Sequence, residues 1–409
     1  MYFAEALDFL KMSVRERQPP SIDAIQTIIR KARINGLSVE EIAELAIVYA
    51  SSGEQLSLSQ NKNIIADIAS TGGPSSLSTL LCPLYLVLMG ANVPKLGVPG
   101  RPAGGIDVLA QVQGYKTHLT DSEISSVINR CGYAHFNAGI YAPLDAEIFS
   151  YRQKTDAQNI PDLVIASLLS KKLCVGIDRI GLDIRVSSFG NFGSNFDEAR
   201  QNAYKFCDVA KFLGKEAVCF LTNGAIPYQP YIGRSEALYA LNNIFSANLD
   251  KMLSEHDQLC FTMANQLLGP SNSYKPEFGS LQKVFIENIE CQNGRLESYY
   301  EAIKSVHEAH IHEILSEDEG LLIIDLHLIR SILVDAQKKS SLKKSKFPDP
   351  CGVILKSEAG KRVKKGEILA TFRCNQNEDR SLAAKFEKAF KISETIDSDK
   401  SRFEVIKGV

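Results

Sequence analysis

The segment Asp67–Leu81, "DIASTGGPSSLSTLL", has the residue types of an anion-binding turn. Its apolar start predicts the end of a buried strand, Ser70–Gly73 predicts a tight turn, and Leu77–Met89 predicts a helix. A helix that begins after such a turn directs unpaired backbone N–H groups and the positive end of its dipole at one point. The segment contains no lysine, arginine or histidine. It therefore predicts an anion cradle without a positive charge of its own.

This cradle does not follow either common nucleotide-binding pattern. It lacks the Gly-Lys-Ser/Thr ending of a P-loop and the Gly-x-Gly-x-x-Gly spacing of a dinucleotide site. Gly-Gly turns between a strand and a helix are also common structural features. From spacing alone, the anion-binding and the purely structural interpretations both stay open.

A second candidate lies in "PDLVIASLLSKKLCVG", which predicts a helix over Pro161–Val175. Ser167 and Lys171 are four residues apart, so their hydroxyl and ammonium groups share one helix face and could hold one ligand together. Such a pair on its own is more often a solvated surface, and the adjacent Lys172 weakens the functional interpretation.

The only histidine cluster is "VHEAHIHEI", with His307, His310 and His312. A metal site would need a further ligand from elsewhere in the chain. The alternation favours an exposed edge strand, and we expect neither a metal nor a cofactor.

The composition excludes several classes of protein. The 409 residues carry a formal net charge of -2, which gives no basic face for nucleic acid or a membrane surface. Nine cysteines without a Cys-x-x-Cys pair are typical of a reducing compartment. The longest apolar run, Leu80–Met89, is too short to span a bilayer. These features predict a cytoplasmic globular protein with no nucleic-acid or membrane partner.

The chain contains three regions with different sequence patterns. The first fifty residues predict helices, and Ser38 with Glu41 forms a capping box before an apolar stripe of helical period. From about residue 60, short apolar runs alternate with longer helical patterns, which predicts an α/β fold with a mainly parallel sheet. The predicted strands are "NIIADIA", "VPKLGV", "RIGLDIRV" and "EAVCFLT", and further predicted helices cover Asn195–Leu213 and Ser235–Asn248. "CGVILKSEAGKRVKKGEILATFRC" predicts a C-terminal β-hairpin of a barrel-sandwich type.

Taken together, these segments resemble the pyrimidine nucleoside phosphorylase family, which includes thymidine phosphorylase. "IASTGG" is similar to the family's K-H-S-T-G-G, and "PGRPAGGID" is similar to its S-G-R-G…T-G-G-T-x-D segment. "APLDAEIFSYRQ" supplies Arg152, and Ser167 and Lys171 follow at the family's spacing of fifteen and four residues. The C-terminal hairpin is also similar. The resemblance covers most of the chain.

The resemblance implies a small helical domain facing a larger α/β domain, with a homodimer formed through the helical part. The implied boundaries are 1–58 and 142–176 for the helical domain, 59–141 and 177–320 for the α/β domain, and 321–409 for a C-terminal α+β module. The apolar stripe of Ser38–Ala50 and the helices near it are similar to the family's dimer surface.

The resemblance also implies a site for a pyrimidine nucleoside or base and inorganic phosphate. The pyrimidine would lie between Arg152, Ser167 and Lys171, with Arg152 and Lys171 as catalytic groups that stabilise the leaving base anion. The implied phosphate-binding residues are Ser70, Thr71, Gly72, Gly73, Ser78, Thr79 and Arg101.

The departures from the family pattern all fall on the phosphate side. Ile68 and Ala69 replace the family's lysine and histidine, Pro99 replaces a serine, and Ile106 replaces a threonine. The sequence therefore predicts a pentosyltransferase that cleaves the N-glycosidic bond with phosphate, where Arg101 or Arg185 compensates for the missing lysine. Two alternatives stay open: a related enzyme that uses water or another acceptor, and a non-catalytic nucleoside-binding homologue.

Overall fold

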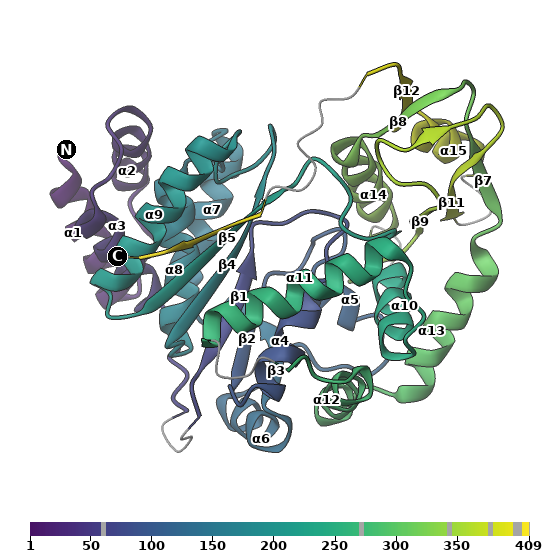
Figure 1. The fold of residues 1–409 in the computed structure, drawn as a ribbon. Coiled ribbons are helices and arrows are strands. Elements are labelled where there is room, and N and C mark those ends of the chain that lie inside the picture. Colours follow the sequence, from purple (N-terminus) through teal and green to yellow (C-terminus); the bar gives the residue numbers. More distant parts are fainter. Residues whose placement is uncertain (59–62, 270–273, 342–345, 375–378, 396–402, 409) are drawn as a thin grey trace.

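An all-helical layer lies at one end of the molecule, next to the N-terminus (Figure 1). The computed structural model describes residues 1–58, 63–269, 274–341, 346–374, 379–395 and 403–408. The helical layer consists of α1 (Phe3–Glu16), α2 (Ile22–Ile34), α3 (Val39–Ala50), α7 (Pro143–Lys154) and α8 (Pro161–Cys174). The predicted capping box is confirmed, because the Ser38 side chain accepts from the Glu41 N–H and the Glu41 side chain accepts from the Ser38 N–H.

The central sheet is mainly parallel, which confirms the predicted α/β class. Its strands are β1 (Ala66–Ser70), β4 (Arg179–Val186), β5 (Glu216–Asn223) and β13 (Phe403–Lys407), in the order β1-β4-β5-β13, with only β13 antiparallel. A parallel pair, β2 (Val93–Gly97) and β3 (Tyr133–Asn137), continues beyond β1 through a bridge between Ile65 and Asn92. The carboxyl ends of these parallel strands therefore meet at one edge, where α/β proteins place their sites.

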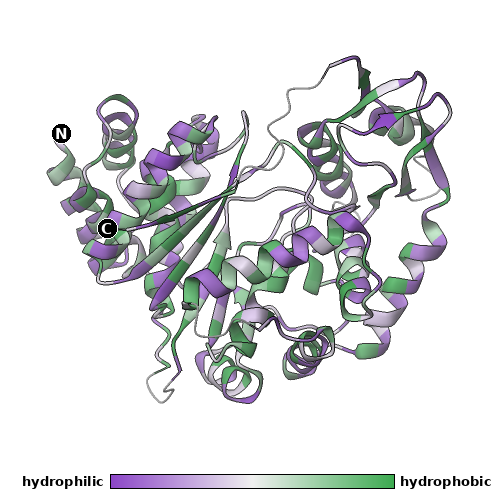
Figure 2. Cartoon of the chain, in the orientation of Figure 1, coloured by the Kyte–Doolittle hydropathy of each residue, from purple (hydrophilic) through white to green (hydrophobic). Residues whose placement is uncertain are grey.

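Helices cover the sheet with their apolar faces turned inward (Figure 2). Helices α4 (Ser78–Leu88), α9 (Phe196–Phe212) and α11 (Lys251–Leu268) contact the central sheet, and α5 (Gly105–Leu109), α6 (Asp121–Cys131) and α12 (Phe278–Cys291) contact β3. Helices α10 (Arg234–Phe245) and α13 (Leu296–Ala309) contact strands of the C-terminal module, and a 3-10 turn, η1, spans Ala138–Ile140. Helix α4 is almost wholly buried, and Tyr85 packs edge-on against Phe261 of α11 with ring centroids 5.6 Å apart. The first turn of α4 is thereby fixed at the end of β1.

The C-terminal module contains two small sheets with helices α14 (Leu326–Ser341) and α15 (Asp379–Glu387). One sheet has the order β6-β9-β11-β7, formed by Tyr231–Ile232, Cys351–Leu355, Ile368–Cys374 and His312–Leu315. The other has the order β10-β8-β12, formed by Arg362–Val363, Gly320–Ile324 and Phe390–Ser393. The antiparallel pairing of β9 with β11 matches the predicted hairpin, whereas β10 between them pairs with β8.

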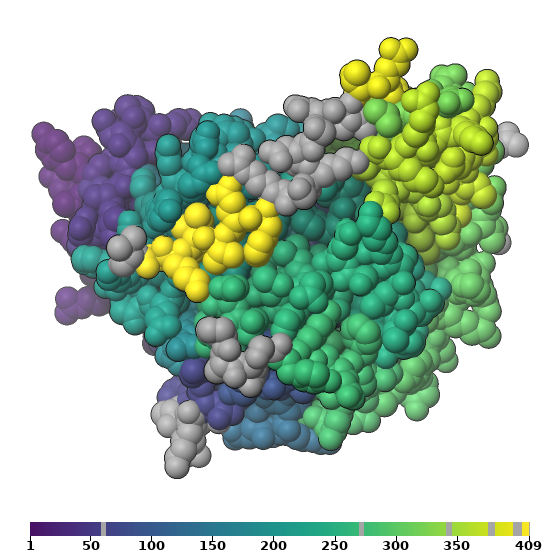
Figure 3. Space-filling view, viewed as in Figure 1, coloured from purple at the N-terminus to yellow at the C-terminus, as the bar shows by residue number. Residues whose placement is uncertain are grey.

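The last described strand lies outside the module in which we expected it. Strand β13 pairs with β5 of the central sheet, and Figure 3 shows it crossing the face of the molecule away from the rest of the module. The bidentate pair between Arg200 of α9 and Glu404, at 2.9 and 3.0 Å, holds it there. Residues 403–407 therefore belong to the central sheet, whereas β7, at residues 312–315, belongs to a sheet of the C-terminal module.

Two expectations from the sequence need correction. The apolar stripe of α3, which we expected on a dimer surface, is buried within the chain against α8 and α9. In the histidine cluster only His312 lies in a strand, β7, at the edge of its sheet. His307 lies in the last turn of α13, and the His310 side chain is buried. His310 is buried because its Nε2 lies 3.0 Å from the Glu236 carboxylate, 74 residues earlier in the chain.

Glu236 of α10 joins the α/β part to the C-terminal module. Arg373 of β11 donates from Nε and Nη2 to the two Glu236 oxygens, at 2.7 and 3.0 Å, and from Nη2 to Asp349 at 2.8 Å. Burial alone would raise the pKa of Glu236, but Arg373 and His310 outweigh it and hold the pKa at about 2. The carboxylate is therefore ionised and depends on its cationic partner.

We expect Arg373→Met to lower the free energy of unfolding by about 3–5 kcal/mol, because it leaves Glu236 and Asp349 buried without this cation. Urea denaturation measures the loss. Arg362→Met is the matched control, since the Arg362–Glu319 pair is exposed and should contribute below about 1 kcal/mol. Equal effects of the two substitutions would contradict a structural role for the buried network.

Candidate active site

Ser167 and Lys171 lie together on α8, as their spacing predicts. The Lys171 ammonium donates to Ser167 Oγ and to the Ser167 carbonyl oxygen, both at 3.0 Å, and to the Asp145 carboxylate. Asp145 is buried on α7, whereas the Lys171 side chain keeps 17% exposure. The lysine is thus oriented by a carboxylate from a neighbouring helix and stays accessible.

Sequence analysis missed Asp145. It lies seven residues before Arg152, which is two helical turns, so both side chains project from one face of α7. This spacing within "APLDAEIFSYRQ" was the sequence feature from which Asp145 could have been identified. Its partner Lys171, however, is 26 residues away, and no local pattern joins the two.

The resemblance implied that Arg152 contacts the pyrimidine, whereas in the structure its guanidinium binds backbone carbonyl groups. It is fully buried, and its guanidinium donates to the carbonyl oxygens of Ala157, Gln158 and Leu163 at 3.1, 2.8 and 3.2 Å. These carbonyls belong to the segment that leads into α8. Burial lowers the pKa of Arg152, and the nearby Tyr49 and Asp145 oppose that shift. Arg152 therefore fixes the start of the helix that carries Ser167 and Lys171.

Some hydroxyl groups of the turn at the end of β1 bind β4, and others are left for a ligand. Thr71 Oγ1 accepts from the Arg185 backbone N–H at 3.0 Å, and Ser78 Oγ donates to Asp183 at 2.7 Å, so both tie the turn to β4. Ser70 Oγ accepts from the Gly72 N–H at 3.2 Å within the turn. Among the described residues, no hydrogen bond to the Thr79 hydroxyl is present. Ser70 and Thr79 are the hydroxyls left to meet a ligand.

The two arginines that could replace the missing lysine occupy different settings. Arg185 is buried beneath the turn, paired with Asp183 and bonded to the hydroxyls of Ser76 and Ser78. Arg101 has an exposed side chain, and its backbone is held by Asp107 through an N–H bond at 3.0 Å. Asp107 in turn pairs with Arg234 at 2.8 Å, so it is committed to the loop.

Asp67 of β1 binds two lysines from other elements. Lys95 of β2 donates to Asp67 Oδ1 at 2.6 Å, and Lys172 of α8 donates to Oδ2. Burial alone would raise the pKa of Asp67, but Lys172 and Lys95 outweigh it and hold the pKa below its usual range. The Lys172–Asp67 contact connects the helical layer to the sheet. Sequence analysis counted Lys172 only as a weakening neighbour and did not identify Lys95.

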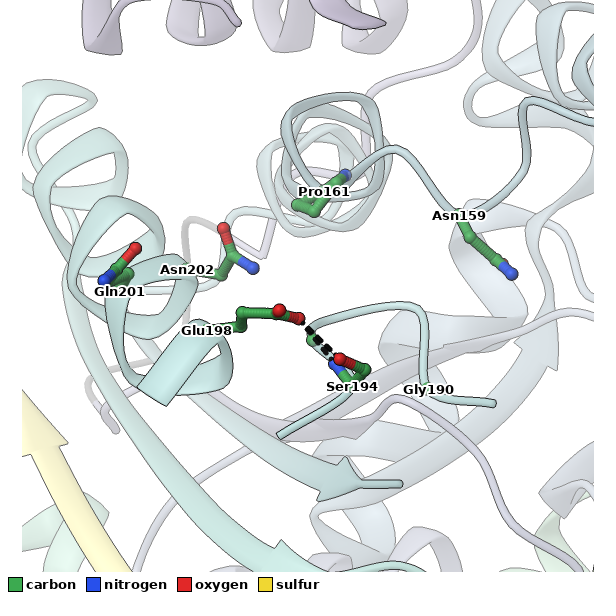
Figure 4. A pocket seen from close by; sticks show the side chains of 8 residues that line it. Asn159, Pro161, Gly190, Ser194, Glu198, Gln201 and Asn202 are labelled. Atoms are coloured by element: carbon green, nitrogen blue, oxygen red, sulfur yellow. Dashed lines mark hydrogen bonds between the residues drawn. The ribbon is translucent and has the colours of Figure 1, made fainter. Parts of the chain in front are cut away.

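An open polar hollow of about 410 Å³ lies beside this region (Figure 4). It is lined by Asn159, Pro161, Gly190, Gly193, Ser194, Glu198, Gln201 and Asn202, and thus by the start of α8, the loop after β4 and the start of α9. Glu198 accepts from the Ser194 N–H and hydroxyl at 2.9 and 2.8 Å, which closes the loop. Neither the trio on α7 and α8 nor the turn after β1 lines this hollow.

Two general properties of the described ranges bear on function. No group of three or more histidine, cysteine, aspartate or glutamate side chains in them is placed to hold a metal ion. Within the same ranges no helix combines the length and apolar character that crossing a membrane requires.

The fold is shared with a phosphoribosyltransferase. The chain superposes on anthranilate phosphoribosyltransferase from Thermus thermophilus with a TM-score of 0.52 and 15% identity, covering 74% of this chain and 94% of that one. This likeness concerns the fold. No model of a protein family matches the chain.

Curated relatives give a more specific identification. Pyrimidine-nucleoside phosphorylase from Geobacillus stearothermophilus is 24% identical over 384 residues, which cover 88% of this chain and 86% of that protein. The Bacillus subtilis enzyme of the same name is 25% identical over 366 residues, covering 85% and 83%. These homologues confirm the resemblance to the pyrimidine nucleoside phosphorylase family and support an enzyme of the pentosyltransferase type.

The start of α4 contains a pH-sensitive contact. The Leu77 N–H donates to Nε2 of His256 at 2.8 Å, which requires a neutral imidazole. Burial, with the positive charge of Arg185 nearby, lowers the pKa of His256 to about 3. In the unfolded chain the imidazole has its ordinary pKa of about 6.5. Its contribution to stability is therefore present above pH 6.5 and is lost as the pH falls towards 3.

We expect His256→Gln to reduce this acid sensitivity, because glutamine can still accept from Leu77 but does not titrate. Between pH 6.5 and 4, the variant should lose about 1.4 kcal/mol less stability per pH unit than the natural protein. Urea denaturation across this pH range measures both slopes, and identical slopes would show that His256 does not titrate on unfolding.

Proposed function

We propose that the protein cleaves the N-glycosidic bond of a pyrimidine nucleoside and transfers the pentose to inorganic phosphate. The observation that carries this proposal is the Asp145–Lys171–Ser167 arrangement on two adjoining helices. Ser167 and Lys171 follow the spacing found in the resemblance, and the relatives at 22–25% identity are named for this activity.

The proposed chemistry follows the charge that develops in the reaction. A phosphate oxygen attacks C1′ of the sugar, the bond between C1′ and the base nitrogen breaks, and its electron pair leaves with the pyrimidine. Lys171 would donate to a carbonyl oxygen of this departing anion, where a positioned cation stabilises the transition state. Asp145 orients the ammonium, and Arg152 fixes the start of α8 from behind.

Substrate binding would exchange one contact of Lys171. All three ammonium donors are engaged, two by Ser167 and one by Asp145. Rotation about χ1 of Ser167 releases the contact to its hydroxyl without disturbing the helix. The base oxygen then takes this place, and the Ser167 hydroxyl can orient the ring.

Lys171→Met should lower kcat about 100-fold and raise KM for the nucleoside by a much smaller factor, because the contact to the neutral base is weak and the leaving anion exists only in the transition state. Uracil or thymine release from uridine and thymidine measures both constants. Lys154→Met is the matched control, since Lys154 is exposed at the end of α7. A rise in KM alone would assign Lys171 to ground-state binding.

The acceptor is tested by the same assay with and without inorganic phosphate. Phosphate-dependent release supports phosphorolysis. Release at an equal rate without phosphate supports the second candidate, a hydrolase-like reaction, which the apolar Ile68 and Ala69 favour. No release under either condition would favour the non-catalytic homologue.

A homodimer through the helical layer belongs to the proposal. Exposed apolar side chains occur on the first three helices: Phe9, Met12, Ile22, Ile34 and Ile47. An ion pair between Lys11 and Glu44, at 3.3 Å, joins α1 to α3 next to Met12 and one turn from Ile47. These exposed side chains replace the buried α3 stripe as the expected interface.

Light scattering should give twice the chain mass of 45.1 kDa at micromolar protein. Ile47→Glu should shift the mass towards one chain, because it places a charge in an apolar contact. Ile311→Glu, at an exposed isoleucine in the C-terminal module, is the control and should leave the mass unchanged. A natural protein of single-chain mass would refute the dimer.

A further inference from the structure

We propose that Lys95 and Lys172, bridged by Asp67, supply the positive charge for the acceptor oxyanion that position 68 lacks. The proposal rests on the proposed function, because it concerns the anion that receives the pentose. It assigns the counter-charge to strand β2 and helix α8, in place of Arg101 and Arg185.

The three groups leave one buried positive charge unbalanced. The side chains of Lys95, Asp67 and Lys172 are 4%, 0% and 6% exposed, and each Asp67 oxygen binds one ammonium. His135, which faces this cluster from β3, adds no charge, because burial and Lys95 lower its pKa to about 3. Tyr133, bonded to His135, is neutral because burial raises its pKa well above the ordinary value. Two lysines therefore share one carboxylate. Burial lowers the pKa of Lys172 although Asp67 raises it, so a second anion would favour the charged form of both lysines.

Neighbouring charged groups do not correct this imbalance. Lys171 next to Lys172 is paired with Asp145, and Arg185 is paired with Asp183, so each of these pairs is already neutral. Keeping a lone charge away from water costs several kcal/mol unless an opposite charge approaches it. The described part of the chain supplies no such anion at this cluster, which points to a ligand.

The excess charge lies beside the anion cradle. Lys95 Nζ donates to the carbonyl oxygen of Ile68 at 2.7 Å, so the ammonium reaches the residue where the resemblance expects a lysine. In the parallel pair of β2 and β3, Lys95 and His135 are register partners. The ammonium therefore sits between the end of β1 and the His135 ring.

The His135 ring also lies close to the first turn of α4. A Cβ atom added to Gly105 would lie 2.1 Å from His135 Cε1 and 2.7 Å from Thr79 Cγ2, so the ring and Thr79 both pack closely against the Gly105 backbone. The positive end of the α4 dipole acts on the same space. On the other side of the turn, the buried Nη1 of Arg185 has no hydrogen-bond partner among the described residues and faces Gly73.

Substitutions that change the charge of this cluster should change phosphate affinity in a direction that the proposal predicts. Lys95→Met and Lys172→Met each leave one lysine paired with Asp67, so both remove the excess charge and keep a neutral buried pair. By calorimetry, we expect each variant to bind inorganic phosphate at least about tenfold more weakly than the natural protein. Asp67→Asn increases the excess charge and should bind phosphate more tightly. Lys116→Met, at an exposed pair with Glu123, is the control and should not change phosphate affinity.

Thermal unfolding separates this role from a structural one. Without phosphate, Lys95→Met should melt no lower than the natural protein, whereas phosphate should raise the Tm of the natural protein and not that of the variant. A lowered Tm with unchanged phosphate affinity would assign Lys95 to structure and overturn the proposal. Lys95→Arg, which keeps the charge, should retain phosphate binding within about tenfold.

The proposed function and this inference can fail separately. Phosphate-dependent base release together with unchanged phosphate affinity in both methionine variants overturns the inference and leaves phosphorolysis intact. A natural protein that releases base but binds no phosphate overturns the inference and excludes phosphate as the acceptor. Weakened binding in both variants and tighter binding in Asp67→Asn would support it.

Discussion

The carboxylate of Asp67 is the contact on which the rest of the site depends. It lies fully buried near the start of β1, and the two lysines that it binds come from β2 and from α8. The helical layer and the sheet are therefore joined by a charged contact, in addition to apolar packing. A buried carboxylate of this kind is stable only while at least one cation is paired with it, so the Lys172 contact helps to specify the position of α8 over β1.

Helix α8 carries this constraint to the proposed pyrimidine side. Lys172 anchors it to the sheet, while the adjacent Lys171 turns to Asp145 and Ser167 on another face. Arg152 fixes the beginning of the same helix through three backbone carbonyls. One helix thus connects the proposed base-binding and acceptor-binding halves, and neighbouring lysines serve the two sides.

Much of the fold could be predicted from the sequence because its signals are local. "RIGLDIRV" matches β4, and the predicted helix Pro161–Val175 ends one residue from α8, since β-branched runs and a proline at a helix start mark these elements directly. Ser167 and Lys171 were found because one helix turn separates them. Lys95 and Asp145 were not, because their partners are 28 and 26 residues away. A lysine within the apolar run "VPKLGV" was itself a signal, since lysine is seldom fully buried without a partner.

The return of the chain to the central sheet has a consequence for the C-terminus. Without β13, strand β5 would be the outer strand, with its unpaired N–H and C=O groups open to other chains. Residues 403–407 therefore pair with the otherwise unpaired edge of β5, and the Arg200–Glu404 contact holds them there. A chain shortened before residue 403 would keep every proposed site residue and yet expose a template for self-association. Strand β13 thus shields the edge of β5 at a place remote in sequence from the proposed site residues.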